Sequence, residues 1–127
     1  MSDPKLILLA EDDFDLHSSL KHLLEMQGYR IFSAYNGLEA LEILTSSVKP
    51  TWVLLDLMMP VMNGYELLEE LRKRGKVAST PVIVVSAAAD AQATAEEFGL
   101  KFIPKPINFV ELIKTLSSEP NSTSQHP

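Results

Sequence analysis

Cysteine is absent from the 127-residue chain, so neither a disulfide framework nor a thiolate metal site is available to it. No apolar run approaches the roughly 18 residues that a membrane-spanning helix needs. Residues 1–5 lack the charged and apolar regions of a signal peptide. From these absences we expect a soluble, cytoplasmic protein that does not associate with membranes.

Positive charge is scarce: 11 Lys and Arg residues oppose 17 Asp and Glu residues, and the formal net charge is −6. Binding to nucleic-acid phosphates requires clustered Lys and Arg side chains. The basic cluster of residues 72–74 with Lys76 is better explained as the solvated end of a helix. We therefore expect no nucleic acid among the partners.

Histidine is rare as well, with three residues in the chain. His17 and His22 stand five residues apart in an expected helix, so they do not share one face, and His126 lies in the polar tail. We expect none of them to bind metal or to act in catalysis.

Five short apolar runs alternate with five segments of helical character, which is typical of a parallel α/β sheet. The expected strands are residues 6–10, 30–34, 52–55, 81–85 and 102–104. The run at 30–34 is the most polar, which indicates an edge strand. With 46% hydrophobic residues the chain suits a single core, and its length fits a doubly wound, flavodoxin-like sheet of strand order 2-1-3-4-5.

The helical segments carry start and stop signals. Asp13 or Asp15 is suited to cap the first helix, and Gly28 is suited to end it. Asn36 is suited to cap the second helix, whose apolar spacing extends to Val48. The face of the first helix that we expect to be buried consists of Leu16, Leu20, Leu23 and Leu24.

Polar side chains stand at the end of every expected strand except the edge strand. They are Glu11, Asp12 and Asp13 after the first strand, Asp56 after the third, Ser86 after the fourth and Lys105 after the last. In an open parallel sheet, chemistry gathers beyond the carboxyl ends of the strands, and the order 2-1-3-4-5 makes the first and third strands neighbours. A single strand-ending Asp is explained by turn formation alone. Four such coincidences favour a site centred on Asp56.

These residues resemble the motifs of the receiver domain of bacterial two-component response regulators. The matching pieces are Glu11-Asp12-Asp13, Asp56 followed by Met59-Pro60 and Gly64, Ser86-Ala87, and Lys105-Pro106. The resemblance implies a stand-alone receiver domain at residues 1–116. Residues 117–127 are rich in Ser, Thr, Pro and Asn, a composition that predicts a disordered tail. Because no second domain follows, we expect the output to pass through protein contact.

The clustered carboxylates predict a Mg²⁺ ion, because a hard divalent cation relieves their mutual repulsion. Asp12 and Asp56 are the expected direct ligands. The resemblance adds the backbone carbonyl of Met58 as a ligand and Glu11 acting through water. Asp13 is as well suited to cap a helix as to serve the ion.

With the cation in place, Asp56 is suited to accept a phosphoryl group from a phosphohistidine and become an aspartyl phosphate. The Lys105 ammonium and the Ser86 hydroxyl are suited to bind the phosphoryl oxygens. Phe102 stands at the aromatic switch position of the family, although ordinary packing of a strand residue also explains it. In the family, the bond between Lys105 and Pro106 is cis.

The implied function is a signalling switch that catalyses only its own phosphorylation and dephosphorylation. Its expected partners are a sensor histidine kinase or histidine phosphotransfer protein and a downstream protein, which it would meet as a monomer or weak homodimer. One alternative is a binding module that no longer uses phosphorylation, but such a module is expected to have lost an acid, the Ser or the Lys. The other is an aspartyl-phosphate hydrolase, which usually has a second Asp where this chain has Met58.

The chain departs from its family in the segment between Ser86 and Lys105, which is a few residues short and rich in Ala. We expect a short or partly unwound fourth helix there. With few bulky side chains to hold it, residues 87–99 are predicted to be the most mobile ordered part of the unphosphorylated protein.

Overall fold

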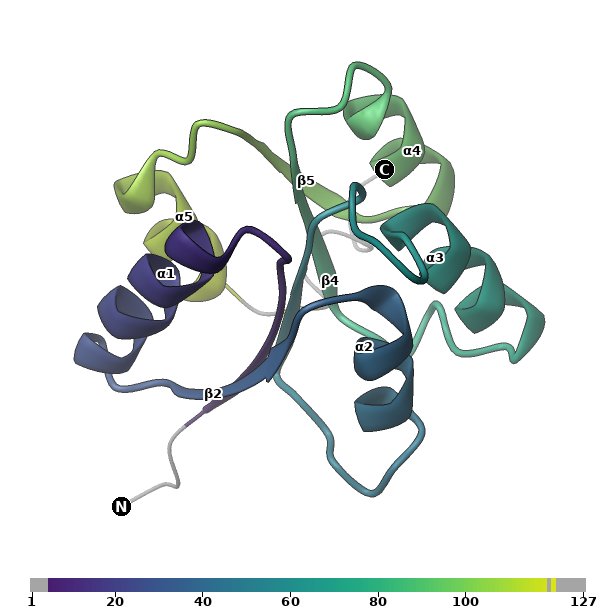
Figure 1. Ribbon diagram of the computed structural model, residues 1–127, viewed down its shortest axis with the longest axis horizontal. Helices are drawn as coiled ribbons and strands as arrows, with labels where there is room; N and C mark the ends of the chain where they lie inside the picture. Colours follow the sequence, from purple (N-terminus) through teal and green to yellow (C-terminus); the bar gives the residue numbers. More distant parts are fainter. Residues whose placement is uncertain (1–4, 119, 121–127) are drawn as a thin grey trace.

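The computed structural model describes residues 5–118 and 120 of the chain. Five strands form one parallel sheet between two layers of helices, with α1 and α5 on one face and α2, α3 and α4 on the other (Figure 1). The elements are β1 (Leu6–Ala10), α1 (Phe14–Met26), β2 (Arg30–Ala34), α2 (Gly37–Leu44), β3 (Trp52–Leu55), α3 (Gly64–Lys73), β4 (Val82–Ser86), α4 (Ala91–Phe98), β5 (Lys101–Pro104) and α5 (Phe109–Leu116).

The strand order is β2-β1-β3-β4-β5, which confirms the predicted flavodoxin-like order 2-1-3-4-5 with β2 at the edge. β1 and β3 pair in parallel, and Ala10 lies opposite Leu55. The next residues along the two strands, Glu11 and Asp56, therefore lie side by side at the carboxyl ends of the strands. In folds of this kind ligands bind there, at the switch point between the first and third strands.

Each face of the sheet packs against its own helix layer, because successive strand residues point to opposite sides. Leu8 and Leu55 belong to the core under α2, α3 and α4, whereas Ile7 and Leu54 belong to the core under α1 and α5. All four are at most 2% exposed, and burying a side chain of this size contributes about 1.5–3 kcal/mol. Burial on both faces explains why the strands read as continuous apolar runs.

Two helix starts follow the prediction. Asp13 and Asn36 cap α1 and α2, and each side chain accepts a hydrogen bond from the backbone amide three residues ahead. The buried residues of α1 are His17, Leu20 and Leu24. Leu23, which was predicted to be buried, is 38% exposed, and His17 is fully buried. The inward stripe of α1 therefore includes a polar side chain.

The end of α2 differs from the prediction that its helical spacing continues to Val48. The helix ends at Leu44, and the hydroxyl of Thr45 donates to the Leu41 carbonyl at 2.9 Å. Thr and Ser side chains that bond back to the preceding turn compete with helix continuation. Val48 accordingly lies in the connection to β3.

The end of the domain is capped locally. The hydroxyls of Ser117 and Ser118 donate to the carbonyls of Ile113 and Thr115 and close the last turn of α5. The rest of the predicted disordered tail, Pro120 excepted, lies outside the described residues. Within residues 5–118 and 120, no helix combines the length and the apolar character that crossing a membrane requires.

Candidate functional site

One lysine joins two buried carboxylates at the carboxyl edge of the sheet. The Lys105 ammonium lies 2.8 Å from Glu11 Oε1 and 3.0 Å from Asp56 Oδ2. Glu11 is 3% exposed and Asp56 is 5% exposed. The ends of β1, β3 and β5 therefore meet in a single charged cluster that carries one more negative than positive charge.

The acidic residues after β1 are held in place by hydrogen bonds with backbone groups. The Glu11 amide donates to the Ala34 carbonyl at 3.0 Å, and Glu11 Oε2 accepts from the Asp13 amide at 2.9 Å. The Asp13 carboxylate in turn caps α1, which is one of its two predicted roles. Asp12, an exposed residue, thus stands between two residues that are fixed in place.

His17 lies directly behind these acids and was not predicted there. Its Nδ1 is 2.8 Å from the Glu11 carbonyl oxygen, and its Nε2 is 2.8 Å from the Ser33 hydroxyl. The ring stacks on Tyr35 with centroids 4.2 Å apart. Burial lowers the pKa of His17, which favours the neutral ring. The available signal was its spacing from Leu20, one turn along the same helix face.

The loop after β3 holds the central carboxylate. The Asp56 amide donates to the Ala10 carbonyl at 3.1 Å, and Asp56 Oδ1 accepts from the Met58 amide at 3.2 Å. A Cβ atom on Gly64 would lie 2.5 Å from the Asp56 carbonyl oxygen, so glycine is required for α3 to begin this close to Asp56. The predicted role of the Met58 carbonyl as a metal ligand stays a prediction.

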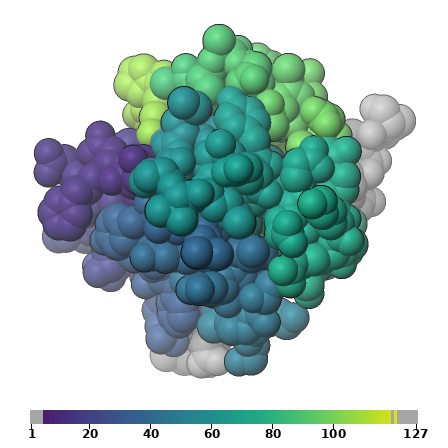
Figure 2. All heavy atoms as spheres, turned by 45° about the vertical axis from the view of Figure 1, so that its right-hand side comes forward, coloured from purple at the N-terminus to yellow at the C-terminus, as the bar shows by residue number. Residues whose placement is uncertain are grey.

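The loop between β3 and α3 also contacts the start of α2. The Gly37 amide donates to the Met62 carbonyl at 2.7 Å, and a Cβ atom on Gly37 would lie 2.5 Å from that oxygen. Figure 2 shows the teal residues of α3 and of the loop before it at the surface, with blue α2 residues below them and green residues of the α4 region above. The loop after Asp56 is therefore fixed at both ends by close contacts that only glycine allows, one at Gly64 and one at Gly37.

Ser86 is the last residue of β4, which lies between β3 and β5 in the sheet. Ser86 is 1% exposed, and its hydroxyl oxygen accepts from the Ala88 amide at 3.2 Å. The Ser86 carbonyl accepts from the Lys105 amide at 3.2 Å. Phe102 is partly buried against the core under α2, α3 and α4, and the Lys105-Pro106 bond is cis, as the family resemblance implied.

The electrostatics of the cluster follow from burial and from its unequal charges. Burial raises the pKa of Glu11, against the hydrogen bonds from Lys105 and from the Asp13 amide. Burial by itself would lower the pKa of Lys105. The hydrogen bonds of Lys105 to Glu11 and Asp56 outweigh burial, and the net result is a raised pKa. Lys105 is therefore charged at neutral pH, while one ammonium cannot neutralise two buried carboxylates.

The same residues fit a divalent cation. Glu11, Asp12 and Asp56 can each offer one carboxylate oxygen, and these oxygens lie within 4.8 Å of one another. Mg²⁺ is usually held by one or two carboxylates and keeps several waters. The excess negative charge of the cluster and its hard oxygen donors both suit such an ion.

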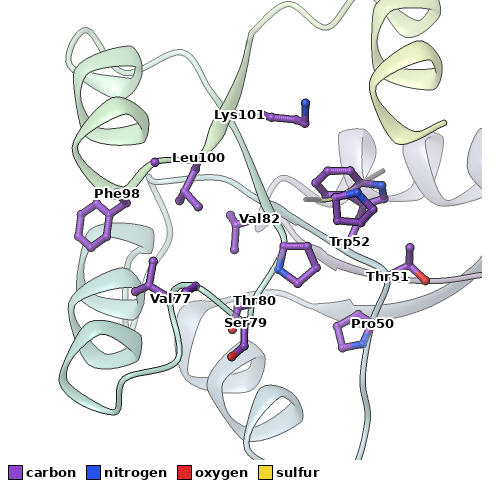
Figure 3. A pocket seen from close by; sticks show the side chains of 14 residues that line it. Pro50, Thr51, Trp52, Val77, Ser79, Thr80, Val82, Phe98, Leu100 and Lys101 are labelled. Atoms are coloured by element: carbon purple, nitrogen blue, oxygen red, sulfur yellow. The ribbon is translucent and has the colours of Figure 1, made fainter. Parts of the chain in front are cut away.

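A separate hollow of about 870 Å³ lies at the other edge of the sheet (Figure 3). It is lined by residues at the starts of β3, β4 and β5, among them Thr51, Val82 and Leu100. Among the described residues that line it, Lys101 carries the only ionisable side chain. The hollow is larger than the space beside Asp56, but its described lining residues include no carboxylate and no imidazole.

The doubly wound sheet and the acids, hydroxyl and lysine at its carboxyl edge define a receiver-type α/β domain. The family model described as "Response regulator receiver domain" matches residues 7–117, and the chain belongs to this family.

Relatives and solved structures agree with this assignment. The transcriptional regulatory protein CpxR homolog of Haemophilus influenzae is 41% identical over 115 residues, which are 88% of this chain and 48% of that protein. The receiver domain of the Francisella response regulator 1452 is 30% identical, with a TM-score of 0.78 over 88% of this chain and 93% of that one. Response regulator TrrA of Thermotoga maritima, solved with Mg²⁺-BeF, is 32% identical, with a TM-score of 0.74 over 88% and 98%. The chain spans about half the length of the first curated relatives that it matches.

Proposed function

We propose that this receiver domain is switched by phosphorylation of Asp56, with a sensor histidine kinase or a histidine phosphotransfer protein as the donor. The observation that carries the proposal is the Lys105 ammonium held between the Asp56 and Glu11 carboxylates. A nucleophilic carboxylate with a cation beside it is equipped for phosphoryl transfer, which depends on positioning and charge stabilisation.

In the proposed transfer, an Asp56 oxygen forms a bond to phosphorus while the phosphorus–nitrogen bond of the phosphohistidine breaks. The departing imidazole keeps the electron pair of that bond. The Lys105 ammonium, 3.0 Å from Asp56 Oδ2, is close enough to pair with a phosphoryl oxygen carried by Asp56. The Ser86 hydroxyl donates to another phosphoryl oxygen, which is the step that couples the site to β4 and to Phe102.

Asp12 and Asp56 would hold Mg²⁺ directly, together with the Met58 carbonyl, while Glu11 would act through water. The bound ion would supply charge neutralisation for the phosphoryl oxygens. The proximity of the three carboxylates supports this assignment, as does the Mg²⁺-BeF complex of the TrrA relative.

The output is proposed to pass through contact with another protein, made by a monomer or weak homodimer. The formal charge of −6 argues against a nucleic-acid surface on this domain, although relatives of about twice its length are named as transcriptional regulators.

Two alternative functions are less well supported. Met58 stands where an aspartyl-phosphate hydrolase usually has its second acid, which argues against turnover of other substrates. The retention of Asp56, Ser86 and Lys105 argues against a module that has abandoned phosphorylation.

The test is phosphate uptake from acetyl phosphate, followed by mass spectrometry of the intact protein. Asp56→Asn is expected to abolish the uptake, because the nucleophile is removed. Asp13→Asn is the matched control: asparagine caps helices as well as aspartate does, so uptake should be retained. Undiminished uptake in Asp56→Asn would place the phosphoacceptor elsewhere, and no uptake in the wild type would favour the binding module.

A further inference from the structure

The hydrogen bonds of His17 fix the tautomer of its ring. A carbonyl oxygen only accepts, so the nitrogen that faces the Glu11 carbonyl at 2.8 Å, Nδ1, must carry the proton. In the neutral ring Nε2 is then an acceptor, and the Ser33 hydroxyl at 2.8 Å must donate to it. A fully buried ring with both nitrogens engaged is fixed in orientation.

The bond to Glu11 reaches the metal-binding acids through the backbone. The peptide group is planar, so the direction of the Glu11 carbonyl also sets the direction of the Asp12 amide and the start of the Asp12 residue. The Glu11 side chain is already engaged with Lys105 and with the Asp13 amide. His17 therefore holds the peptide group from which the exposed Asp12 carboxylate projects.

We infer that His17 is a positioning residue of the phosphoacceptor site, which holds the Glu11–Asp12 peptide so that Asp12 and Asp56 can share one Mg²⁺. The inference rests on the magnesium site of the proposed function. Partners behind metal ligands typically change metal affinity by 10–100-fold when they are removed. For a partner that acts through one peptide group, we expect a loss of about tenfold.

The competing explanation is that His17 only fills space between α1 and β2. Its stacking on Tyr35 and its bond to Ser33 would be sufficient for that role. The two explanations differ in which ring nitrogen matters. Positioning depends on Nδ1, which faces Glu11, whereas packing between α1 and β2 depends on Nε2 and on the ring face.

Substitutions can separate the two nitrogens. His17→Asn places an amide N–H at the position of Nδ1 and loses the contact with Ser33. His17→Gln carries its amide one atom further out, toward the position of Nε2, and loses the donor to Glu11. Ser33→Ala removes the Nε2 partner and leaves the histidine in place. All three are tested by calorimetric titration with Mg²⁺, with thermal melts recorded in the absence of metal.

Positioning predicts that His17→Gln binds Mg²⁺ about tenfold more weakly, while His17→Asn and Ser33→Ala stay within about twofold of the wild type. Because the melting temperature also reports packing between α1 and β2, we do not expect it to rank the three variants in the order of their Mg²⁺ affinities. Equal losses of affinity in His17→Asn and His17→Gln, or no loss in His17→Gln, would overturn the inference.

A second measurement needs no variant and no metal. Nitrogen-15 spectra of the metal-free wild type should show His17 as the Nδ1–H tautomer. The Nε2–H tautomer would overturn the inference, because Nδ1 would then have no proton to donate. If the wild type itself fails to bind Mg²⁺ while the Nδ1–H tautomer is observed, the magnesium site of the proposed function has failed, and the positioning role falls with it.

Discussion

Around the ends of β1 and β3, the carboxylates of Glu11 and Asp56 are held by Lys105 and by backbone amides. Around the end of β4 the restraints are fewer. The Ser86 hydroxyl oxygen accepts one long bond from the Ala88 amide. Asp90, the residue directly before α4, makes no side-chain bond to the helix amides, and its carboxylate accepts from the Tyr65 hydroxyl.

The difference separates two tasks within one site. The acid half, at the ends of β1 and β3, is already assembled in the unphosphorylated protein, which in the proposed function would reduce the reorganisation needed for phosphoryl transfer. The responding half, formed by Ser86, α4 and β5, retains a hydroxyl and a helix start that can adopt new partners. The proposed switch requires an element with two arrangements, and we expect this element in the responding half.

The strongest test of the acid half is Lys105→Met, which keeps most of the length of the side chain and removes its charge. Two buried carboxylates would lose their shared cation, and breaking a buried ion pair in this way costs about 3 kcal/mol in the free energy of unfolding. Asp56→Asn should not lower that free energy, because it leaves a balanced Glu11–Lys105 pair. Urea unfolding without Mg²⁺ measures both. Equal stability of Lys105→Met and the wild type would show that the cluster is not held by charge.

The next effect is stabilisation of the unphosphorylated protein by Mg²⁺. At a metal concentration ten times the Kd, the folded state should gain about 1.4 kcal/mol, because the ion binds only the assembled acids. Asp12→Ala should lose this gain, while Asp13→Asn should keep it. Thermal melts with and without Mg²⁺ decide the matter, and equal gains in Asp12→Ala and the wild type would place the ion elsewhere.

A smaller effect concerns the mobility of the responding half. α4 spans eight residues and has no side-chain cap at its start, so we expect faster amide exchange in residues 87–99 than in α1. A phosphate mimic should slow this exchange as Ser86 is drawn to the site. Two contacts oppose the motion, since Arg72 of α3 pairs with Glu97 at 2.9 Å and lies over the Phe98 ring. Hydrogen exchange as slow in α4 as in α1, with and without the mimic, would remove the distinction between the two halves.

The smallest effect appears at high pH, in the bond between Tyr65 and Asp90. That hydrogen bond raises the pKa of Tyr65 from 10.0 to about 12. A raised pKa means that the folded state favours the neutral phenol, so the contribution is present below pH 10 and is lost as the pH approaches 12. Unfolding curves of Tyr65→Phe and the wild type should therefore converge between these values. A constant difference would show that the bond does not link α3 to α4 in solution.

The acids, Ser86 and Lys105 could be predicted from the sequence because each ends a strand, and the parallel order turns positions far apart in the chain into neighbours. His17 was missed, since it was considered only as a metal ligand or a catalytic group, and its partner Ser33 lies on β2, 16 residues along the chain. The contact between Tyr65 and Asp90 spans 25 residues and belongs to no apolar pattern. The extension of α2 to Val48 was wrong because hydroxyl groups just after the helix outweigh an apolar spacing.

Trapping the acyl phosphate tests the central claim most directly. Borohydride reduces an aspartyl phosphate to homoserine, so protein incubated with acetyl phosphate and Mg²⁺ can be reduced, digested and sequenced by mass spectrometry. The structure predicts homoserine at position 56, in a Mg²⁺-dependent yield, with Asp12 and Asp13 unmodified. Homoserine at another acid, or none at position 56 in protein shown to carry phosphate, would contradict the assignment of Asp56 as the phosphoacceptor.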